Sequence, residues 1–269
     1  MSDEFDSRYW DSVAETMQGR YHLDPVMAEH KRRVHLDLLR EWLPGERLAG
    51  ARILKTDVFE EAHGPDQVLL DWPGNAKARV FAMDLSPRMG ALARDRMRGV
   101  GVAVPMIAAD NRALPFRDGA FDVVYSCSTL DHFDSIGDLL AGLRETARVV
   151  APGGALLLTL DNPETRFYPL VRALERRGLV QFKLGETLPG DEIAKRAHEL
   201  GLSLEKLRPV YHVPRVVVTA ALRAARAVPG DALAKRIDRW LSAAETKGRA
   251  RRDRKTAWYT AALLRKGMT

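Results

Sequence analysis

Residues 105–163 constrain the fold of this 269-residue chain most, because strand-like and helix-like patterns alternate there. Residues 122–126 form a short apolar run with β-branched members, which predicts a buried parallel strand that opens into a polar loop. Apolar residues then recur at helical spacing, and they are Ile136, Leu139, Leu140, Leu143, Ala147 and Val150. A Pro-Gly-Gly turn at 152–154 leads into the apolar strand 155–160. Strand, helix and strand in this order predict a right-handed crossover in a parallel sheet.

An acid, Asp84, closes an earlier predicted strand at residues 79–83. A carboxylate at the C-terminal edge of a parallel strand can accept both hydroxyls of a ribose, as acids do in doubly wound nucleotide-binding folds. The structural alternative is a helix cap, but Ser86 followed by Pro87 is a better capping pair for the next helix. We therefore expect Asp84 at an exposed strand end, where it is available to a ligand.

Several motifs share their order and spacing with one protein family. The first is Asp110-Asn111 followed by Leu-Pro-Phe at 114–116, the second is Phe-Asp-Val-Val at 121–124, and the third is the run 148–154 that ends in Pro-Gly-Gly. Together with Asp84, they resemble the class I S-adenosylmethionine-dependent methyltransferases, of the type 11-like group, over residues 50–162.

The resemblance implies an α/β fold that is Rossmann-like and doubly wound, with a mostly parallel seven-stranded sheet. It also implies S-adenosyl-L-methionine as the cofactor. Leu85 would pack against the adenine ring, and Asp110 would accept a hydrogen bond from the adenine amino group. The backbone of Asn111 would lie nearby, and Ser126 would complete this part of the site.

The loop after the first predicted strand, residues 52–54, departs from the family. The usual loop carries an acid and several glycines, because a Cβ would obstruct the approach of the backbone to the methionine portion of the cofactor. Here Lys55 stands in the place of the acid, and Gly64 is the first glycine. Either Thr56 and Asp57 remodel the pocket, with Asp57 taking the cofactor's ammonium group, or cofactor binding is weakened or lost. We favour remodelling because the downstream motifs are intact.

Composition limits the remaining classes of protein. With 46% hydrophobic residues the chain is expected to bury a core, and its single cysteine, Cys127, excludes an internal disulfide. No cysteine and histidine residues have zinc-ligand spacing, so no metal is expected. The acidic start is unlike a signal peptide, and no apolar run approaches the roughly 20 residues of a membrane-spanning helix. A cytoplasmic location is expected, while the sequence gives no indication of the oligomeric state.

The net charge of +6 is uneven. Basic residues crowd one short stretch near the C-terminus, and they are Lys247, Arg249, Arg251, Arg252, Arg254 and Lys255. Such a run is usually a solvated loop. The alternatives are a peripheral contact with an anionic membrane surface and a site for a phosphorylated substrate. Nucleic acid is not an expected partner, because no aromatic residues interleave with these charges.

The flanks of the core are expected to be helical and to belong to one domain, residues 1–269. The expected parts are N-terminal helices at 1–48, the cofactor-binding core at 49–161, and a substrate-side insert, the last strands and a helical insertion at 162–269. Helices are predicted at 5–20 and at 25–43, where Asp24-Pro25 starts the second one. Apolar patterns at 162–190 and 214–250 predict a helical cap.

The leading function is methyl transfer from S-adenosylmethionine to a small-molecule or lipid-like acceptor. The alternative is a catalytically silent or repurposed member that binds a ligand or a protein partner, since fold alone does not separate the two. For an oxygen or nitrogen acceptor, the protein must position the reactants and remove a proton. His132 follows the fourth strand, and an unperturbed histidine pKa of about 6.5 suits that task; its competing role is structural. The candidate substrate-binding residues are Tyr9, Trp10, Tyr21, Tyr168 and His212.

Overall fold

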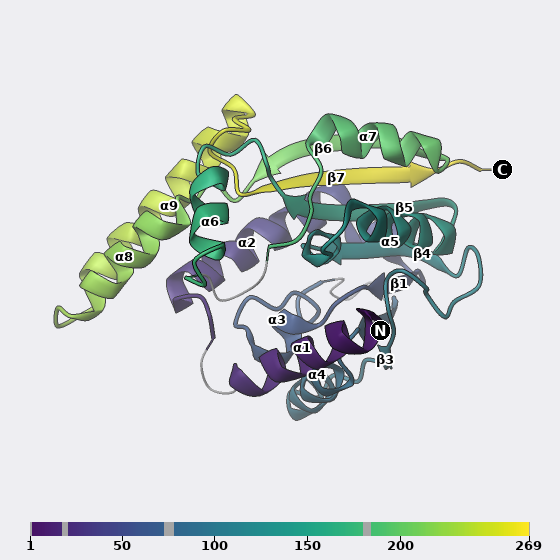
Figure 1. Cartoon of the computed structure of the whole chain (residues 1–269), viewed down its shortest axis with the longest axis horizontal. Coiled ribbons are helices and arrows are strands. Elements are labelled where there is room, and N and C mark those ends of the chain that lie inside the picture. Colours follow the sequence, from purple (N-terminus) through teal and green to yellow (C-terminus); the bar gives the residue numbers. More distant parts are fainter. Residues whose placement is uncertain (1, 18–20, 73–77, 180–183, 269) are drawn as a thin grey trace.

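A computed structural model of the chain describes residues 2–17, 21–72, 78–179 and 184–268. Within these ranges seven strands form one sheet in the order β3-β2-β1-β4-β5-β7-β6 (Figure 1). The strands are β1 Arg52–Lys55, β2 Arg79–Asp84, β3 Met106–Ala108, β4 Phe121–Cys127, β5 Val150–Asp161, β6 Leu202–Val210 and β7 Tyr259–Lys266. Only β7 runs antiparallel to its neighbours, β5 and β6. The predicted α/β fold with a mostly parallel seven-stranded sheet is confirmed.

Helices occupy the connections between these strands. They are α1 Ser2–Thr16, α2 Pro25–Trp42, α3 Phe59–His63, α4 Pro87–Gly99, α5 Ile136–Val149, α6 Tyr168–Glu175, α7 Gly190–Glu199, α8 Arg215–Arg226 and α9 Ala232–Arg251, with 3₁₀ turns η1 Gly45–Leu48 and η2 Leu130–His132. The predicted caps are confirmed: the Asp24 side chain accepts from Val26 N–H, and the Ser86 side chain accepts from Met89 N–H. Proline at the first helical position needs no N–H donor, so both helices begin where the sequence places them.

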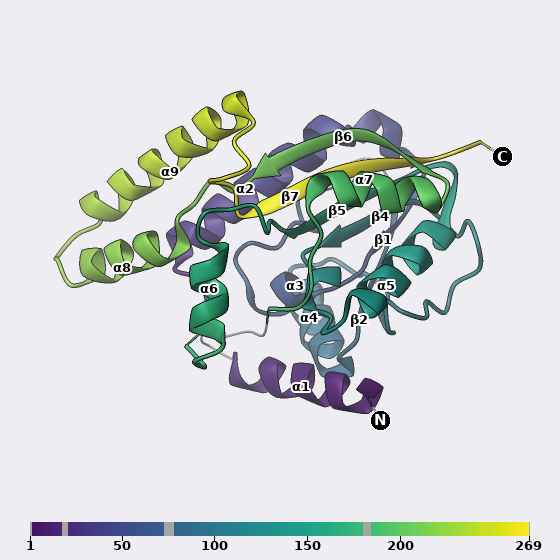
Figure 2. The same ribbon diagram turned by 45° about the horizontal axis from the view of Figure 1, so that its top comes forward.

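Both faces of the central strands are covered by helices (Figure 2). On one face, Ile53, Tyr125 and Leu157 pack in a cluster with residues of α2, α8 and α9. On the other face, Leu54 and Val124 pack in a cluster with residues of α5 and α7. Alternation of side chains along each strand therefore supplies two buried faces, which is why these strands read as continuous apolar runs.

The N-terminal helix α1 packs beside α4, and its Val13 and Ala14 join a third cluster that includes Ala82 of β2. The carboxyl end of α1 stops before Gln18, and residues 18–20 lie outside the described ranges. Ser7 of α1 donates a hydrogen bond to the backbone oxygen of Leu85. A helix from the N-terminal flank therefore covers the carboxyl end of β2.

Only part of the basic stretch near the C-terminus is the loop that its charge pattern predicts, because residues 252–255 form the turn after α9. Residues 247–251 continue α9, which ends at Arg252 in a left-handed conformation with φ of 50°. Gly248 lies within α9, and its lack of a side chain makes room for the His212 ring. A Cβ at this position would lie 2.3 Å from His212 Cγ. Arg249 pairs with Glu245 at 2.8 Å, so part of the positive charge is neutralised within α9.

Candidate cofactor and acceptor site

The parallel strands bring the predicted site residues to one edge of the sheet. β1 pairs with β2 on one side and with β4 on the other. The order of the strands along the chain therefore reverses between β1 and β4. Ligands of open α/β sheets bind outside the carboxyl ends of the strands at such a reversal. The residues that follow β1, β2, β3 and β4 meet here, and they are Thr56 and Asp57, Leu85, Asp110 and Asn111, and Ser128 and Thr129.

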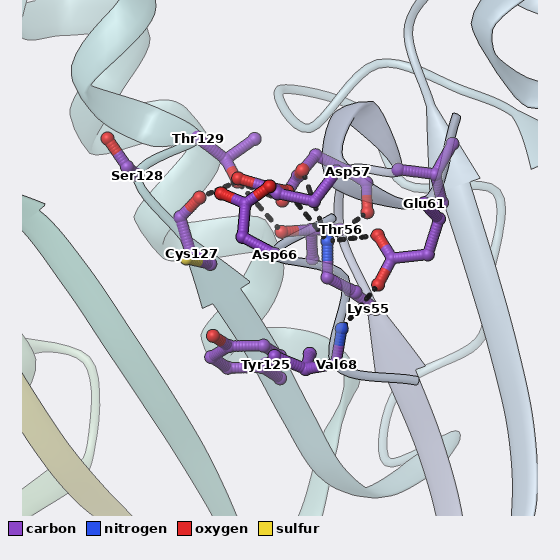
Figure 3. Close-up of polar contacts among 12 residues, drawn as sticks. Lys55, Thr56, Asp57, Glu61, Asp66, Val68, Tyr125, Cys127, Ser128 and Thr129 are labelled. Atoms are coloured by element: carbon purple, nitrogen blue, oxygen red, sulfur yellow. Dashed lines mark hydrogen bonds and ion pairs between the residues drawn. The ribbon is translucent and has the colours of Figure 1, made fainter. Parts of the chain in front are cut away.

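Lys55, the last residue of β1, turns its ammonium group inward rather than toward solvent (Figure 3). Its side chain is 2% exposed, and Nζ lies 2.9 Å from Glu61 Oε2 and 3.2 Å from Asp57 Oδ1. Burial opposes the charged form, but Asp57, Glu61 and Glu60 hold the pKa of Lys55 well above its ordinary value. Lys55 is therefore a buried cation that ties the loop after β1 together.

A second buried lysine, Lys31 of α2, extends this network. Its ammonium group lies 2.8 Å from Glu60 Oε1 and 3.2 Å from Asp66 Oδ2. Four carboxyl groups thus surround two ammonium groups, so carboxyl groups outnumber cations in this network. A cavity of about 10 Å³ lies between these side chains, which is room for about one water molecule. We call residues 55–64 the first loop from here on.

Asp57 and Thr56 join the first loop to the end of β4. The Thr129 hydroxyl donates to Asp57 Oδ2 at 2.9 Å, and Thr56 N–H donates to the Tyr125 carbonyl at 3.1 Å. Burial raises the pKa of Asp57 to about 8, although the neighbouring Lys55 opposes this rise. Asp57 is therefore largely protonated at neutral pH, and a nearby positive charge would favour its ionised form.

Gly64 lacks a side chain for a packing reason. A Cβ at this position would lie 2.0 Å from Asp66 Oδ1 and 2.8 Å from the Tyr21 hydroxyl. Its φ of −87° is open to any residue. The first glycine after β1 thus allows Tyr21 and Asp66 to approach the backbone.

Asp84 is buried, which corrects the expectation of an exposed strand end. It is 8% exposed, and its two oxygens accept from Ser86 N–H at 2.9 Å and Val58 N–H at 3.1 Å. Burial raises its pKa to about 6, and the two backbone donors oppose this rise. The first loop and the turn before α4 fold over this acid, and a carboxylate oxygen that accepts one bond retains a second lone pair.

Asp110 and Asn111 follow β3 with different partners. Asp110 accepts from the backbone and the guanidinium of Arg112, at 2.7 Å and 2.6 Å. The Asn111 amide donates to the Thr56 carbonyl at 3.2 Å, and its buried Oδ1 has no partner among the described residues. The buried Ser126 hydroxyl is likewise unpartnered within the described ranges. We call Asp84, Asp110 and Asn111 the acid corner.

His132 lies in the turn η2, next to a helix from the other end of the chain. The ring of Trp10 on α1 meets the His132 ring edge to face, with centroids 5.2 Å apart. Tyr9 packs against Trp10 in the same manner at 5.2 Å. The structure therefore brings two of the predicted aromatic residues to the histidine that was predicted as a base.

Two buried acids beside His132 were not identified from the sequence. Asp131 Oδ2 accepts from the Ser128 hydroxyl at 3.0 Å and from the backbone N–H of Asp161. Burial, followed by the charge of Asp131, raises the pKa of Asp161 to about 7, while Arg215 and His132 oppose this rise. Asp161 is the last residue of a buried strand, at the edge of the sheet where ligands bind. That position in the sequence could have identified it as a candidate site residue.

The remaining predicted substrate residues separate into two groups. Tyr168 of α6 is half-buried, and the charges of Asp161 and Asp131 act on its hydroxyl. His212 instead packs against Gly248 of α9, and its Nδ1 lies 2.9 Å from Thr256 Oγ1. Tyr168 thus lies near the buried acids, whereas the contacts of His212 connect the end of β6 to α9. Across the described ranges, no group of three or more His, Cys, Asp and Glu side chains could hold a metal ion.

Comparisons with known proteins agree with this arrangement. The family described as a methyltransferase domain matches residues 62–158, so the match begins after Lys55 and covers the acid corner. The demethylmenaquinone methyltransferase of Thermus thermophilus is 41% identical over 115 residues, which are 42% of this chain and 50% of the relative. The chain spans half or less of the length of the first curated relatives it matches.

Solved structures extend the similarity to the fold. The phosphoethanolamine N-methyltransferase 2 of Haemonchus contortus, solved with S-adenosyl-L-methionine, has a TM-score of 0.56 and 20% identity over 86% of this chain and 52% of its own. A methyltransferase of Mesorhizobium loti has a TM-score of 0.51 and 19% identity over 86% of this chain and 96% of its own. In its motifs, its matched domain over residues 62–158 and its sheet order, the chain is similar to the class I S-adenosylmethionine-dependent methyltransferases.

Proposed function

We propose that this protein transfers a methyl group from S-adenosylmethionine to a small-molecule or lipid-like acceptor. The matched domain and the similar structures support the cofactor, since one of those neighbours was solved with S-adenosyl-L-methionine. The named relative that acts on demethylmenaquinone supports a lipid-like acceptor.

The residues at the sheet edge fit this cofactor. Asp84 keeps free lone pairs for ribose hydroxyls, and Asn111 Oδ1 is a buried acceptor without a partner in the described part of the chain. Asp110 would accept from the adenine amino group, with Leu85 against the ring. The excess of carboxyl groups in the first loop favours a cation, and Asp57 would take the ammonium group of the methionine portion. When bound, the cofactor supplies a methyl group that its sulfonium already activates.

Proton removal is the chemistry left to this chain's side chains. His132 would accept the proton of an oxygen or nitrogen acceptor, because it stands at the ligand edge beside Trp10. Asp161 lies within electrostatic reach of His132, so its carboxylate would stabilise the imidazolium that forms. Trp10 and Tyr9 on α1 would exclude water from this reaction.

The observation that carries the proposal is the convergence of Asp84, Asn111 and Asp57 at the strand reversal of a matched methyltransferase domain. Incubating the full chain with methyl-tritiated S-adenosylmethionine and fractionated cell extracts tests it. We expect protein-dependent label in a small-molecule or lipid fraction. Label that stays with the cofactor in every fraction, while the cofactor binds, would support the silent alternative instead.

We further propose that the α8 and α9 pair contacts an apolar or anionic surface. Val217 of α8 is 59% exposed and Trp240 of α9 is 51% exposed, and the basic stretch lies at the end of α9. No helix in the described ranges is long and apolar enough to span a bilayer. Reversing the exposed charges of Arg251 and Arg252 is expected to weaken sedimentation with anionic liposomes. Unchanged sedimentation would remove the support for this contact.

A further inference from the structure

Arg215, the first residue of α8, is a half-buried cation without an ionic partner. No hydrogen bond or ion pair joins its guanidinium to any residue of the described ranges. Its guanidinium lies over the ring of Trp258, with Cζ 4.7 Å from the ring centroid. By contrast, the partly buried Arg52, Arg112 and Arg249 each pair with a carboxylate.

A second unpartnered polar group lies near this arginine, because Arg215 and Tyr211 both contact Trp258. Tyr211 is 1% exposed, and its hydroxyl has no hydrogen-bond partner among the residues that are described. The hydroxyl lies within electrostatic reach of Arg215. Leaving a buried hydroxyl unpaired is unfavourable, so the site is suited to an acceptor that the described residues do not provide.

The backbone holds Tyr211 in an unfavourable conformation to place this hydroxyl. Its φ of 61° lies in the left-handed region, which costs a non-glycine residue on the order of 1–3 kcal/mol. Glu245 accepts from Tyr211 N–H at 3.2 Å, and the Tyr211 carbonyl accepts from Trp258 N–H at 3.0 Å. These bonds fix the end of β6 against the start of β7, at the same sheet edge as Asp161.

We propose that Arg215 and Tyr211 bind a carboxylate group of the methyl acceptor, and that the acceptor carries this group on an aromatic or apolar body. The inference rests on the proposed methyl transfer and names its substrate class. A guanidinium and a hydroxyl are suited to one carboxylate. The neighbouring Asp161 and Asp131 disfavour a doubly charged phosphate at the same place.

The position of the arginine relative to His132 gives the acceptor an orientation. Both Arg215 and His132 act electrostatically on Asp161, so the anchoring cation and the proposed base both lie within reach of this buried acid. The rings of Trp258, Tyr211 and Tyr259 surround the anchor, and the last two lie 5.7 Å apart. The apolar body of the acceptor would pack on these rings while its reactive atom lies toward His132.

Simple probes test the anchor without knowledge of the acceptor. We would titrate the full chain with benzoate, benzamide and phenyl phosphate, using ligand-observed NMR and calorimetry, with and without S-adenosylhomocysteine. Benzoate is expected to bind more tightly than both others. The proposal is overturned if benzamide or phenyl phosphate binds as tightly as benzoate, or if benzoate does not bind the native protein.

Variants then assign the binding to the arginine. Arg215→Met is expected to weaken benzoate binding about 10-fold or more, because a charge-assisted pair is lost, and Arg215→Lys should retain part of it. Arg223→Met removes the same charge from an exposed position of α8 and should change nothing. Equal benzoate affinity in Arg215→Met and native protein would contradict the assignment.

A separate titration with S-adenosylmethionine distinguishes the two proposals. If the cofactor binds and benzoate does not, the carboxylate anchor fails while methyl transfer stands. If benzoate binding depends on Arg215 but the cofactor does not bind, the anchor stands and the methyl transfer fails. Cofactor affinity should be equal in native protein and Arg215→Met.

Discussion

The first loop and the acid corner lie at one sheet edge but are built in opposite ways. In the acid corner, Asp84 is held by two backbone N–H donors, and Asp110 pairs with the neighbouring Arg112. In the network around the first loop, the ammonium groups of Lys55 and of Lys31 on α2 lie among four carboxyl groups, and the contacts are ionic. Both regions remain acidic overall, so both suit a ligand that carries hydroxyls, an amino group and positive charge.

The difference shows how a glycine-poor loop remains compatible with the fold. Lys55 turns away from the ligand edge, so its long side chain fills the interior instead of the space above β1. Thr56, which is 1% exposed, and Asp57 follow the end of the strand and are tied to Asn111 and Thr129. Asp84 in the acid corner depends on backbone N–H donors, whereas Lys55 in the first loop depends on ion pairs, and the two should respond differently to substitution.

The largest effect is expected from Lys55→Met. The substitution leaves Glu61 as a buried carboxylate without its cation, while Glu60 keeps Lys31, and the loss of one partner of a buried ion pair typically costs about 3–5 kcal/mol. Urea denaturation measures the free energy of unfolding. The double variant Lys55→Met with Glu61→Gln should recover part of the loss, and a single variant as stable as the native protein would show that the network contributes no stability.

The next largest effect is expected from a substitution outside both regions, which should change turnover but not cofactor binding. His132→Ala is expected to reduce turnover about 10²-fold while cofactor affinity stays unchanged, because general-base catalysis typically contributes at least this much. His198→Ala on α7 serves as the control, since it removes a histidine far along the chain from η2. Native turnover in His132→Ala across the pH range would leave this histidine with a structural role only.

A smaller effect is expected at the acid corner. Asp84→Ala should weaken cofactor binding about 10-fold or more, because charge-assisted bonds to the ribose are lost. It should also lower the free energy of unfolding by about 1–3 kcal/mol, since two buried N–H groups lose their acceptor. Calorimetry and urea denaturation measure the two effects. Asp95→Asn on the exposed side of α4 is the control, and native cofactor affinity in Asp84→Ala would refute the assignment.

The smallest predicted effect is a pH dependence that arises in the first loop. Because the pKa of Asp57 is raised to about 8, the free protein holds this proton at pH 7. A bound cation favours the carboxylate and lowers this pKa, so binding should release protons and affinity should rise between about pH 6 and 8. Calorimetry in buffers with different ionisation enthalpies detects the release. Asp57→Asn should abolish it, and equal heats with the native protein would contradict the role of Asp57.

The sequence predicted the sheet well because its signals are local. The apolar runs of β4 and β5, the caps Ser86 and Asp24, and the Pro-Gly-Gly turn each act within a few residues. The boundaries differ by a few residues: the strand predicted at 155–160 is β5 Val150–Asp161, because its pairing with β4 already starts at Val150.

The site was less predictable because its contacts join distant segments. Asp84 was expected to be exposed, but it is buried, and it accepts a hydrogen bond from the N–H of Val58, which lies 26 residues earlier in the first loop. The partner that Glu60 finds in Lys31 lies 29 residues earlier, on α2. Arg215 lies in a flank where the family motifs fade, so only the folded chain shows that it lacks an ionic partner in the described ranges.

Calorimetric titration of the full chain with S-adenosylmethionine tests the central claim most directly, namely that the first loop and the acid corner together bind one cofactor. Adenosine and methionine, titrated separately, serve as fragments that reach one region each. The account predicts saturable one-to-one binding of S-adenosylmethionine, tighter than either fragment, with Asp84→Asn weakening adenosine and Asp57→Asn weakening methionine. The absence of heat and of any shift in Tm up to the solubility limit of the cofactor would contradict it.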